Sequence, residues 1–243
     1  MSAHTPRLPC RPAKLALVSG EYPELADSLK RQGITPIKTL FDSRLPAPLG
    51  YHPDMQVFLF EREAFVLRKS ALQDKLSSLG LSVKETIRQP ESWYPCDVLC
   101  NGFVWDKWLV GNPQTLDAGI QNAAQAKGLE LLPVRQGYAA CSTALIDEKA
   151  CITADAGMVK ALEAKGFSVL KIQPGFIRLP GYDTGFIGGC CGKVSADVLA
   201  VSGRLDSHPD GKAIQAFCES RSVSIWELTQ NPLIDVGGIL PLA

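Results

Sequence analysis

A repeat of about 45 residues is the feature of this sequence that most restricts its fold. In the clearest copy, 97–134, two short apolar runs precede a helical apolar pattern that ends at Gly128, and a third apolar run follows. The same order returns in four further stretches, 14–40, 55–87, 144–172 and 197–229. The first two of these fit less closely, and the one from 14 has one strand fewer. The sequence therefore predicts five units with the order strand, strand, helix, strand.

Units of this size cannot bury their own sheets, so we expect them to pack side by side and share one core. An open parallel sheet is the alternative, because any α/β chain alternates strands and helices. Against it, the strands come three to a helix, and no Gly-rich phosphate loop follows a first strand. The sequence predicts a single α/β domain over 14–243, a closed five-unit ββαβ ring, after an N-terminal tail at 1–13.

The composition excludes several classes of function. Lys plus Arg and Asp plus Glu both number 25, so no net charge attracts nucleic acid or an anionic membrane. No segment approaches the roughly 20 apolar residues that span a bilayer, and the first residues lack the apolar stretch of a secretory signal. We therefore expect a cytoplasmic protein that binds neither nucleic acid nor a membrane and keeps its cysteines mostly reduced.

Several motifs resemble those of one superfamily. The ending LIDVGGILPLA is similar to the Gly-Gly turn before the nucleophilic cysteine of the penteins, the guanidino-group-modifying superfamily. The stretch HPDMQVFLFEREAFVL is similar to their His-x-Asp motif, and NGF, CST, ITAD, GFIGG and SHPD resemble a bacterial family assigned to this fold. The resemblance covers nearly the whole chain. It implies a ring of five ββαβ units (an α/β propeller) with a small guanidino or amidino compound bound in its central channel.

The connections between units are expected to reach that channel. They run from the last strand of one unit to the first strand of the next, at 49–54, 94–97, 137–143, 182–197 and 233–238. The polar and thiol residues that they contain are His52, Asp54, Cys96, Asp97, Cys141, Ser142, Thr143, Asp183, Cys190, Cys191 and Asp235. Glycines in three of these connections let backbone approach whatever occupies the channel.

The tripeptide His-Pro-Asp occurs twice, and the two copies have different meanings. His52 lies in a connection before a strand, so we expect its side chain to point into the channel. His208 precedes a helical pattern, where Pro209 suits the first turn and Asp210 complements the helix dipole. The second copy is therefore interpreted as a helix start, and His52 is the candidate for acid/base chemistry.

Reaction at a guanidinium carbon needs a thiolate nucleophile, an acid/base group and carboxylates that hold the planar cation. After Gly237-Gly238, where the superfamily has its cysteine, this chain has Ile239, whereas Gly188-Gly189 is followed by Cys190 and Cys191. The hypothesis is a rotated site with Cys190 or Cys191 as nucleophile and His52 as acid/base. Cys141 is the reserve nucleophile, followed by the hydroxyls of Ser142 and Thr143, and the substrate carboxylates are Asp54, Asp97, Asp183 and Asp235.

Three other interpretations stay open. The chain can be a non-catalytic protein that binds a small polar ligand or a protein partner in the channel. The adjacent cysteines can be small core residues. A zinc site from Cys96, Cys100, Cys141 and Cys190 or Cys191 is the third, but no second close Cys or His pair completes it, so neither a metal nor another cofactor is predicted.

Overall fold

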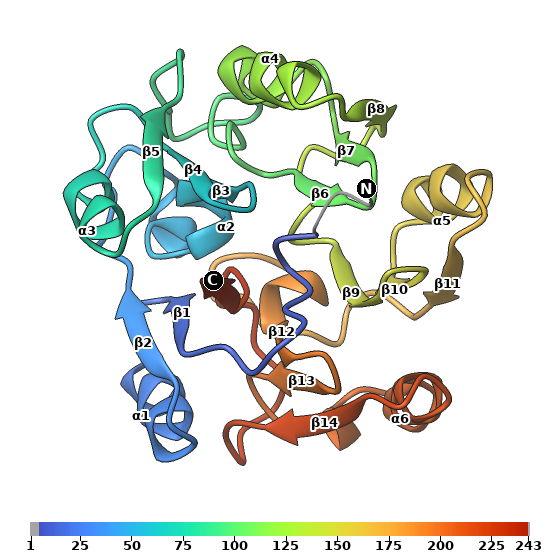
Figure 1. Cartoon of the computed structure of the whole chain (residues 1–243). Helices are drawn as coiled ribbons and strands as arrows, with labels where there is room; N and C mark the ends of the chain where they lie inside the picture. The colour runs from blue at the N-terminus through green and yellow to red at the C-terminus, as the bar shows by residue number, and fades with distance from the viewer. Residues whose placement is uncertain (1–4, 243) are drawn as a thin grey trace.

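The computed structural model describes residues 5–242, which form five β-sheets of three strands each (Figure 1). The strands are β1 (Leu15–Val18), β2 (Thr35–Lys38), β3 (Val57–Leu59), β4 (Glu63–Val66), β5 (Ser82–Glu85), β6 (Phe103–Trp105), β7 (Trp108–Gly111), β8 (Glu130–Pro133), β9 (Thr143–Asp147), β10 (Ala150–Thr153), β11 (Ser168–Lys171), β12 (Cys191–Ser195), β13 (Val198–Val201), β14 (Ser224–Glu227) and β15 (Leu240–Leu242). In each sheet one outer strand pairs antiparallel and the other parallel with the middle strand.

One longer helix follows the middle strand of each sheet. The helices are α1 (Pro23–Arg31), α3 (Leu72–Ser78), α4 (Ala118–Ala126), α5 (Ala156–Glu163) and α6 (Gly211–Glu219), with the single turn α2 (Pro53–Gln56) ahead of β3. Asp155 caps α5, as the sequence predicted, by accepting a hydrogen bond from the Met158 N–H at 2.8 Å. Each helix in the described range is too short or too polar to cross a lipid bilayer.

The first unit obtains its missing strand from the other end of the domain. β15 pairs antiparallel with β1, with Leu242 opposite Leu15 and Leu240 opposite Leu17, and β2 pairs parallel on the other side of β1. This explains why the sequence pattern from residue 14 contains one strand fewer than the others. The two ends of the described chain therefore meet in one sheet.

The five sheets lie around a common centre, with the longer helices at the periphery (Figure 1). The strands nearest the centre are β3, β6, β9, β12 and β15, and contacts join β9 to β12, β12 to β15 and β3 to β6. Throughout residues 5–242, however, the strand ladders stay within each unit. The predicted order of units is confirmed, but the ring is not a closed sheet. Neighbouring units meet through side-chain packing and single backbone hydrogen bonds, such as that from the Ile239 N–H to the Cys191 carbonyl at 3.1 Å, and not through strand ladders.

The inner strands are buried on both sides. All residues of β3, β6 and β15 are buried, which explains why their sequences are continuous apolar runs without polar alternation. The core consists of several apolar clusters, and the members of each come from neighbouring units. The packing between units thus fixes the positions of the connections at the centre.

Candidate functional site

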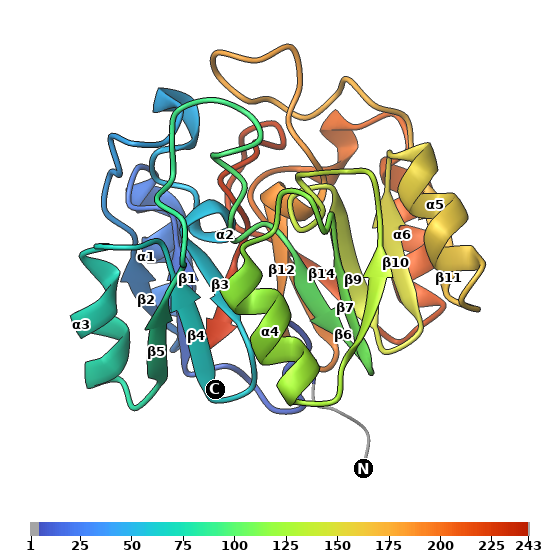
Figure 2. The same ribbon diagram turned by 90° about the horizontal axis from the view of Figure 1, so that it is seen from above.

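The two faces of the ring differ (Figure 2). On the hairpin face lie the turns after β6, β9 and β12 and the two ends of the described chain. On the opposite face, which we call the loop face, the long connections 39–52, 86–97 and 172–187 gather. Of the predicted site residues, His52, Asp97 and Asp183 belong to these three connections.

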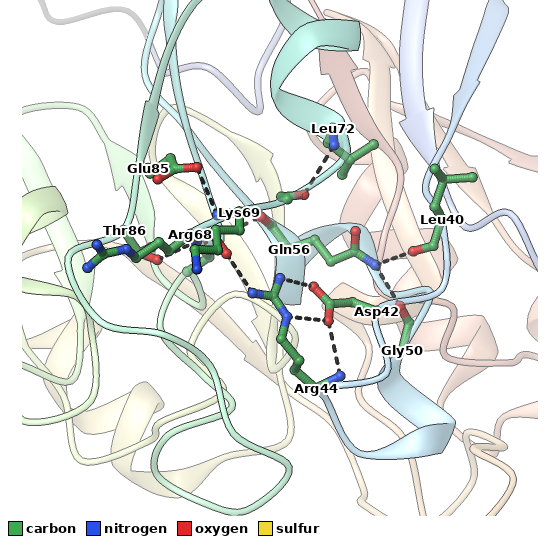
Figure 3. A network of polar contacts seen from close by, with 12 residues as sticks. Leu40, Asp42, Arg44, Gly50, Gln56, Arg68, Lys69, Leu72, Glu85 and Thr86 are labelled. Atoms are coloured by element: carbon green, nitrogen blue, oxygen red, sulfur yellow. Dashed lines mark hydrogen bonds and ion pairs between the residues drawn. The ribbon is translucent and has the colours of Figure 1, made fainter.

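The connection that carries His52 is fixed to the second unit (Figure 3). The Gln56 side-chain amide donates hydrogen bonds to the carbonyls of Leu40 (2.8 Å) and Gly50 (2.6 Å). The Arg44 guanidinium pairs with Asp42 at 2.6 Å and also donates to the Arg68 carbonyl at 2.6 Å. These bonds place His52 at the N-terminus of α2, where its side chain is almost completely buried.

His52 lies close to Asp235 at the centre of the ring. Its Nδ1 is 3.7 Å from Asp235 Oδ1, too far for a hydrogen bond, and Nδ1 has no other partner within residues 5–242. Burial lowers the pKa of His52, and the nearby Asp235 carboxylate opposes this change. The imidazole is therefore neutral at pH 7 and has a free nitrogen for a proton or a ligand.

Cys141 and Asp54 form a buried pair. The Cys141 thiol donates a hydrogen bond to Asp54 Oδ2 at 2.9 Å, and the Asn101 side-chain N–H donates to Cys141 Sγ at 3.0 Å. Asn101 is held in turn by the Ala140 N–H, which donates to its oxygen at 2.8 Å. Asn101 is part of the sequence motif NGF, but the sequence did not predict a role for its side chain. Only the fold shows that the Asn101 amide contacts the Cys141 thiol.

The surroundings of this pair raise the pKa of both Asp54 and Cys141. Burial, and then the charge of Asp235, raises the pKa of Asp54 to about 7, while Arg7 and the bond from Cys141 oppose the rise. Burial and the carboxylates of Asp54 and Asp235 raise the pKa of the Cys141 thiol well above its usual range. In the resting protein the thiol is therefore neutral and donates to a carboxyl group that titrates near neutral pH.

Asp235 is largely occupied by backbone donors. Its Oδ2 accepts from the Phe186 N–H at 2.9 Å and its Oδ1 from the Gly237 N–H at 3.0 Å. A Cβ on Gly189 would lie 2.0 Å from Oδ1, so only glycine fits beside the carboxylate. Asp235 thus joins the connections of the fourth and fifth units next to His52.

The two adjacent cysteines have a different hydrogen-bond partner from Cys141. The thiols of Cys190 and Cys191 both donate to the Ile187 carbonyl, at 3.2 and 3.1 Å. Burial is the main cause that raises the pKa of each thiol. Within residues 5–242, no hydrogen bond joins either sulfur to His52. The structure therefore brings the reserve nucleophile Cys141, and not Cys190 or Cys191, against a predicted carboxylate.

Asp97 is hydrogen-bonded to the middle residue of a row of three aromatic rings. The Tyr138 hydroxyl donates to Asp97 Oδ2 at 2.7 Å, and Oδ1 is buried without a partner in the described chain. The Tyr138 ring stacks between Tyr94, at 6.0 Å between centroids, and Phe186, at 5.9 Å. Burial raises the pKa of Asp97, and the bond from Tyr138 lowers it. The aromatic residues were not among the predicted site residues, although all three lie in the connections between units.

The remaining predicted residues are spread between the centre and the surface. Asp183 is exposed on the loop face, whereas Thr143 is buried and its hydroxyl has no partner within residues 5–242. The Ser142 hydroxyl donates to the Ala139 carbonyl at 3.1 Å, and Ser142 also lines a cavity of about 180 Å³ together with Phe186. Across the described residues no group of three or more His, Cys, Asp or Glu side chains is arranged to hold a metal ion.

Comparison with known proteins identifies the fold. A protein-family model described as "Family of unknown function (DUF6873)" matches residues 17–240. No curated protein sequence matches significantly. Among solved structures, an inosamine-phosphate amidinotransferase from Streptomyces griseus superposes with a TM-score of 0.64 at 12% identity, over 100% of this chain and 97% of that chain.

Two further solved structures give the same result. An amidinotransferase of the saxitoxin biosynthetic pathway from Microseira wollei matches with a TM-score of 0.63 at 6% identity, over 100% of this chain and 97% of that one. An agmatine deiminase from C. jejuni matches with a TM-score of 0.53 at 10% identity, over 98% and 95%. At these identities the likeness shows the fold, which is that of the guanidino-group-modifying superfamily, and not the activity.

Proposed function

The chain belongs to the family of unknown function DUF6873 and has the pentein fold, and from these premises we propose that it is a cysteine-dependent hydrolase or transferase acting on a guanidino or amidino carbon. The observation that carries the proposal is the hydrogen bond of 2.9 Å from the Cys141 thiol to Asp54. The names of the solved neighbours, amidinotransferase and agmatine deiminase, support the substrate class. In this proposal Cys141 takes the role first expected of Cys190 or Cys191.

The proposed reaction uses Asp54 as base and Cys141 as nucleophile. The thiol proton passes to Asp54 Oδ2 while the sulfur forms a bond to the guanidino carbon. The C–N bond to the leaving amine then breaks, and the amine takes the proton back from Asp54. Water, or a second amine in a transferase, displaces the sulfur and regenerates the thiol. A carboxyl group with a pKa of about 7 suits this proton transfer at neutral pH.

In this proposal the bound substrate helps to deprotonate the Cys141 thiol. A guanidinium ion next to Asp54 and Cys141 would stabilise their negative forms and so lower the pKa of both groups. The thiol would then lose its proton only when a cation is bound, which fits the neutral thiol of the resting site. The Asn101 N–H at 3.0 Å from Sγ would stabilise the developing thiolate. His52, with a free nitrogen, is the second proton carrier in this scheme.

Asp97 and the aromatic row are the proposed entrance for the cation. The unpartnered Oδ1 of Asp97 can accept a hydrogen bond from a guanidinium group, and the ring faces of Tyr94 and Tyr138 attract cations. Tyr138 begins the turn that leads to Cys141, and its backbone carbonyl accepts from the Ser142 N–H at 2.9 Å. In this proposal the ligand passes Asp97 on its way to the turn that holds the thiol.

Replacing Cys141 by Ser tests the nucleophile. The protein is incubated with a panel of guanidino and amidino compounds, and amine release and the mass of the intact protein are measured. We expect Cys141→Ser to abolish turnover and any covalent adduct. The matched variants Cys190→Ser and Cys191→Ser, which also replace buried thiols, are expected to keep turnover within about threefold. Loss of turnover in these variants together with full activity in Cys141→Ser would disprove the assignment of Cys141.

Replacing Tyr138 by Phe tests the entrance. The change removes the hydroxyl that donates to Asp97, so the pKa of Asp97 rises further and more of this carboxyl is neutral at a given pH. We expect KM for a guanidinium substrate to increase by about tenfold, as is typical when one charge-assisted hydrogen bond is lost. The increase should grow as the pH falls, while kcat changes little. A KM that does not depend on pH in both proteins would contradict this role of Asp97.

A non-catalytic role is the second candidate, because the buried thiols have raised pKa values and Ile239 follows Gly237-Gly238. Catalytic thiols usually have lowered pKa values. In that case guanidinium compounds would raise the melting temperature, and Asp97→Asn would abolish this effect, but no product would form. Product formation by the wild-type protein excludes this alternative.

A further inference from the structure

The segment 5–13 crosses the hairpin face of the ring and is fixed to three units. The Thr5 hydroxyl donates to Glu148 at 3.1 Å and accepts from the Asp106 N–H at 3.0 Å, so it bonds to the hairpin turns of the third and fourth units. The Ala13 N–H donates to the Val194 carbonyl of β12 at 2.7 Å. Figure 1 shows this segment, in dark blue, running across the middle of the ring. The segment is therefore part of the folded domain and not a free tail.

Leu8 and Arg7 point to different parts of the domain. Leu8 is buried in the apolar cluster that contains Phe103 and Trp105. Arg7 lines a small cavity of about 20 Å³ at the centre of the ring, together with residues of the fourth and fifth units that include Thr143 and Cys191. Because Leu8 holds the backbone against the third unit, the adjacent Arg7 side chain is directed into the ring from the hairpin face.

Arg7 is the positive charge that acts on the site. Burial lowers the pKa of Arg7, and the Asp54 carboxylate, together with the thiols of Cys141 and Cys191 when they are ionised, opposes this change. In return, Arg7 lowers the pKa of Asp54, which Asp235 raises. Within residues 5–242 Arg7 forms no direct ion pair with a carboxylate, so its charge acts through the intervening space. Two buried carboxyl groups thus have near them one guanidinium, that of the partly exposed residue Arg7, which the chain itself supplies.

We propose that Arg7 is the built-in counter-ion of the buried site, a positioning residue that the anchored segment 5–13 holds in the ring so that a positive charge stays beside Asp54 and Cys141. The inference rests on the proposed function only for the chemical role of Cys141. The hairpin face then supplies a fixed cation, while the loop face remains the entrance for a ligand. A positive charge held near two buried carboxyl groups lowers the cost of burying them.

The pKa of Asp54 reports the influence of the Arg7 charge, so it provides the test. The groups that face Asp54 are Asp235, Arg7 and Cys141, and Asn101 contacts the thiol. Aspartate side-chain carbons are labelled with ¹³C, the Asp54 signal is assigned by its loss in Asp54→Asn, and its chemical shift is followed from pH 5 to 9. We expect Arg7→Gln to raise the titration midpoint by about one pH unit, because an attractive charge is lost. Arg7→Lys should restore most of the difference.

The matched control is Arg11→Gln, which removes an exposed arginine of the same segment. It should leave the midpoint unchanged. Thr5→Val, which removes both anchoring hydrogen bonds, should shift the midpoint in the same direction as Arg7→Gln but less, and it serves if Arg7→Gln does not fold. An unchanged midpoint in Arg7→Gln or Thr5→Val, or an equal shift in Arg11→Gln, would overturn the proposal. No substrate is needed, so absence of turnover would remove the proposed function and leave this result intact.

Discussion

Replacing Gly237 by Ala is expected to destabilise the protein by about 3 kcal/mol and to displace His52. Gly237 has a φ of +77°, and a Cβ at this position would lie 2.4 Å from the Cβ and 2.5 Å from the Cα of His52. The left-handed backbone alone costs about 1–2 kcal/mol for alanine, and the contact with a buried backbone adds the cost of overpacking. For a domain of this size the loss corresponds to a fall in Tm of about 10 °C.

The control for this variant is Gly166→Ala. Gly166 has a similar φ of +83°, but nothing lies within 4 Å of the added Cβ. This variant should therefore cost only about 1 kcal/mol, and the difference between the two variants isolates the contact with His52. Equal stabilities, measured by chemical denaturation, would contradict the close packing of Gly237 on His52. In addition, only Gly237→Ala should lower turnover.

Asp54→Asn is expected to reduce turnover by about a thousandfold, because the base beside Cys141 is lost and general-base catalysis contributes effects of this size. The same change should make the protein more stable at pH 8. An ionised Asp54 lies in a buried site next to Asp235, whereas the amide carries no charge. The variant thus separates two effects of the Asp54 carboxylate: it lowers the stability of the folded protein, and it acts as the base in the proposed reaction.

The pH dependence of stability follows from the direction of the shift. The pKa of Asp54 is raised from 3.8 to about 7 in the folded protein. Between these two values the folded state holds a proton that the unfolded state has lost, so stability falls as the pH rises through this range. A shift of this size corresponds to about 4 kcal/mol.

Denaturant unfolding of both proteins from pH 4 to pH 8 measures this contribution. We expect the free energy of unfolding to fall with pH more steeply in the wild-type protein than in Asp54→Asn, and the two curves to differ most above pH 7. Asp183→Asn is a suitable control, because Asp183 is exposed and its replacement should leave the curve unchanged. Parallel curves for wild type and Asp54→Asn would show that Asp54 is not buried in a charged environment.

The order of elements could be predicted from the sequence because it depends on local signals. These signals are apolar runs, helix caps such as Asp155 and helix-ending residues such as Gly128, and each extends over only a few residues. Together they predict five units. The partner of β1 could not be predicted in this way, because β15 lies at the other end of the sequence. The five units were predicted, but the closed ring was not confirmed, since the repeat does not say whether the strand ladders of neighbouring units are joined.

The grouping of the candidate residues could be predicted in part from the sequence. Placing the connections at the centre brought His52, Asp54, Cys141 and Asp235 into one set, and the structure places them close together. The choice among the thiols depended on the direction of each side chain, which a sequence motif does not contain. Asn101 and Arg7 were missed for a related reason. The sequence analysis placed the start of the third unit at residue 97, but β6 begins only at Phe103, so Asn101 belongs to the connection before it. Arg7 precedes the first unit and reaches the ring only through the packing of the fold.

The pairing of β15 with β1 has a consequence for synthesis on the ribosome. Residues 15–18 are made before the four other units, but the strand that completes their sheet is translated only after those units. The nascent chain must therefore carry an incomplete, apolar first sheet until β15 has been made. Chaperones that shield exposed strand edges would act on this segment during that time.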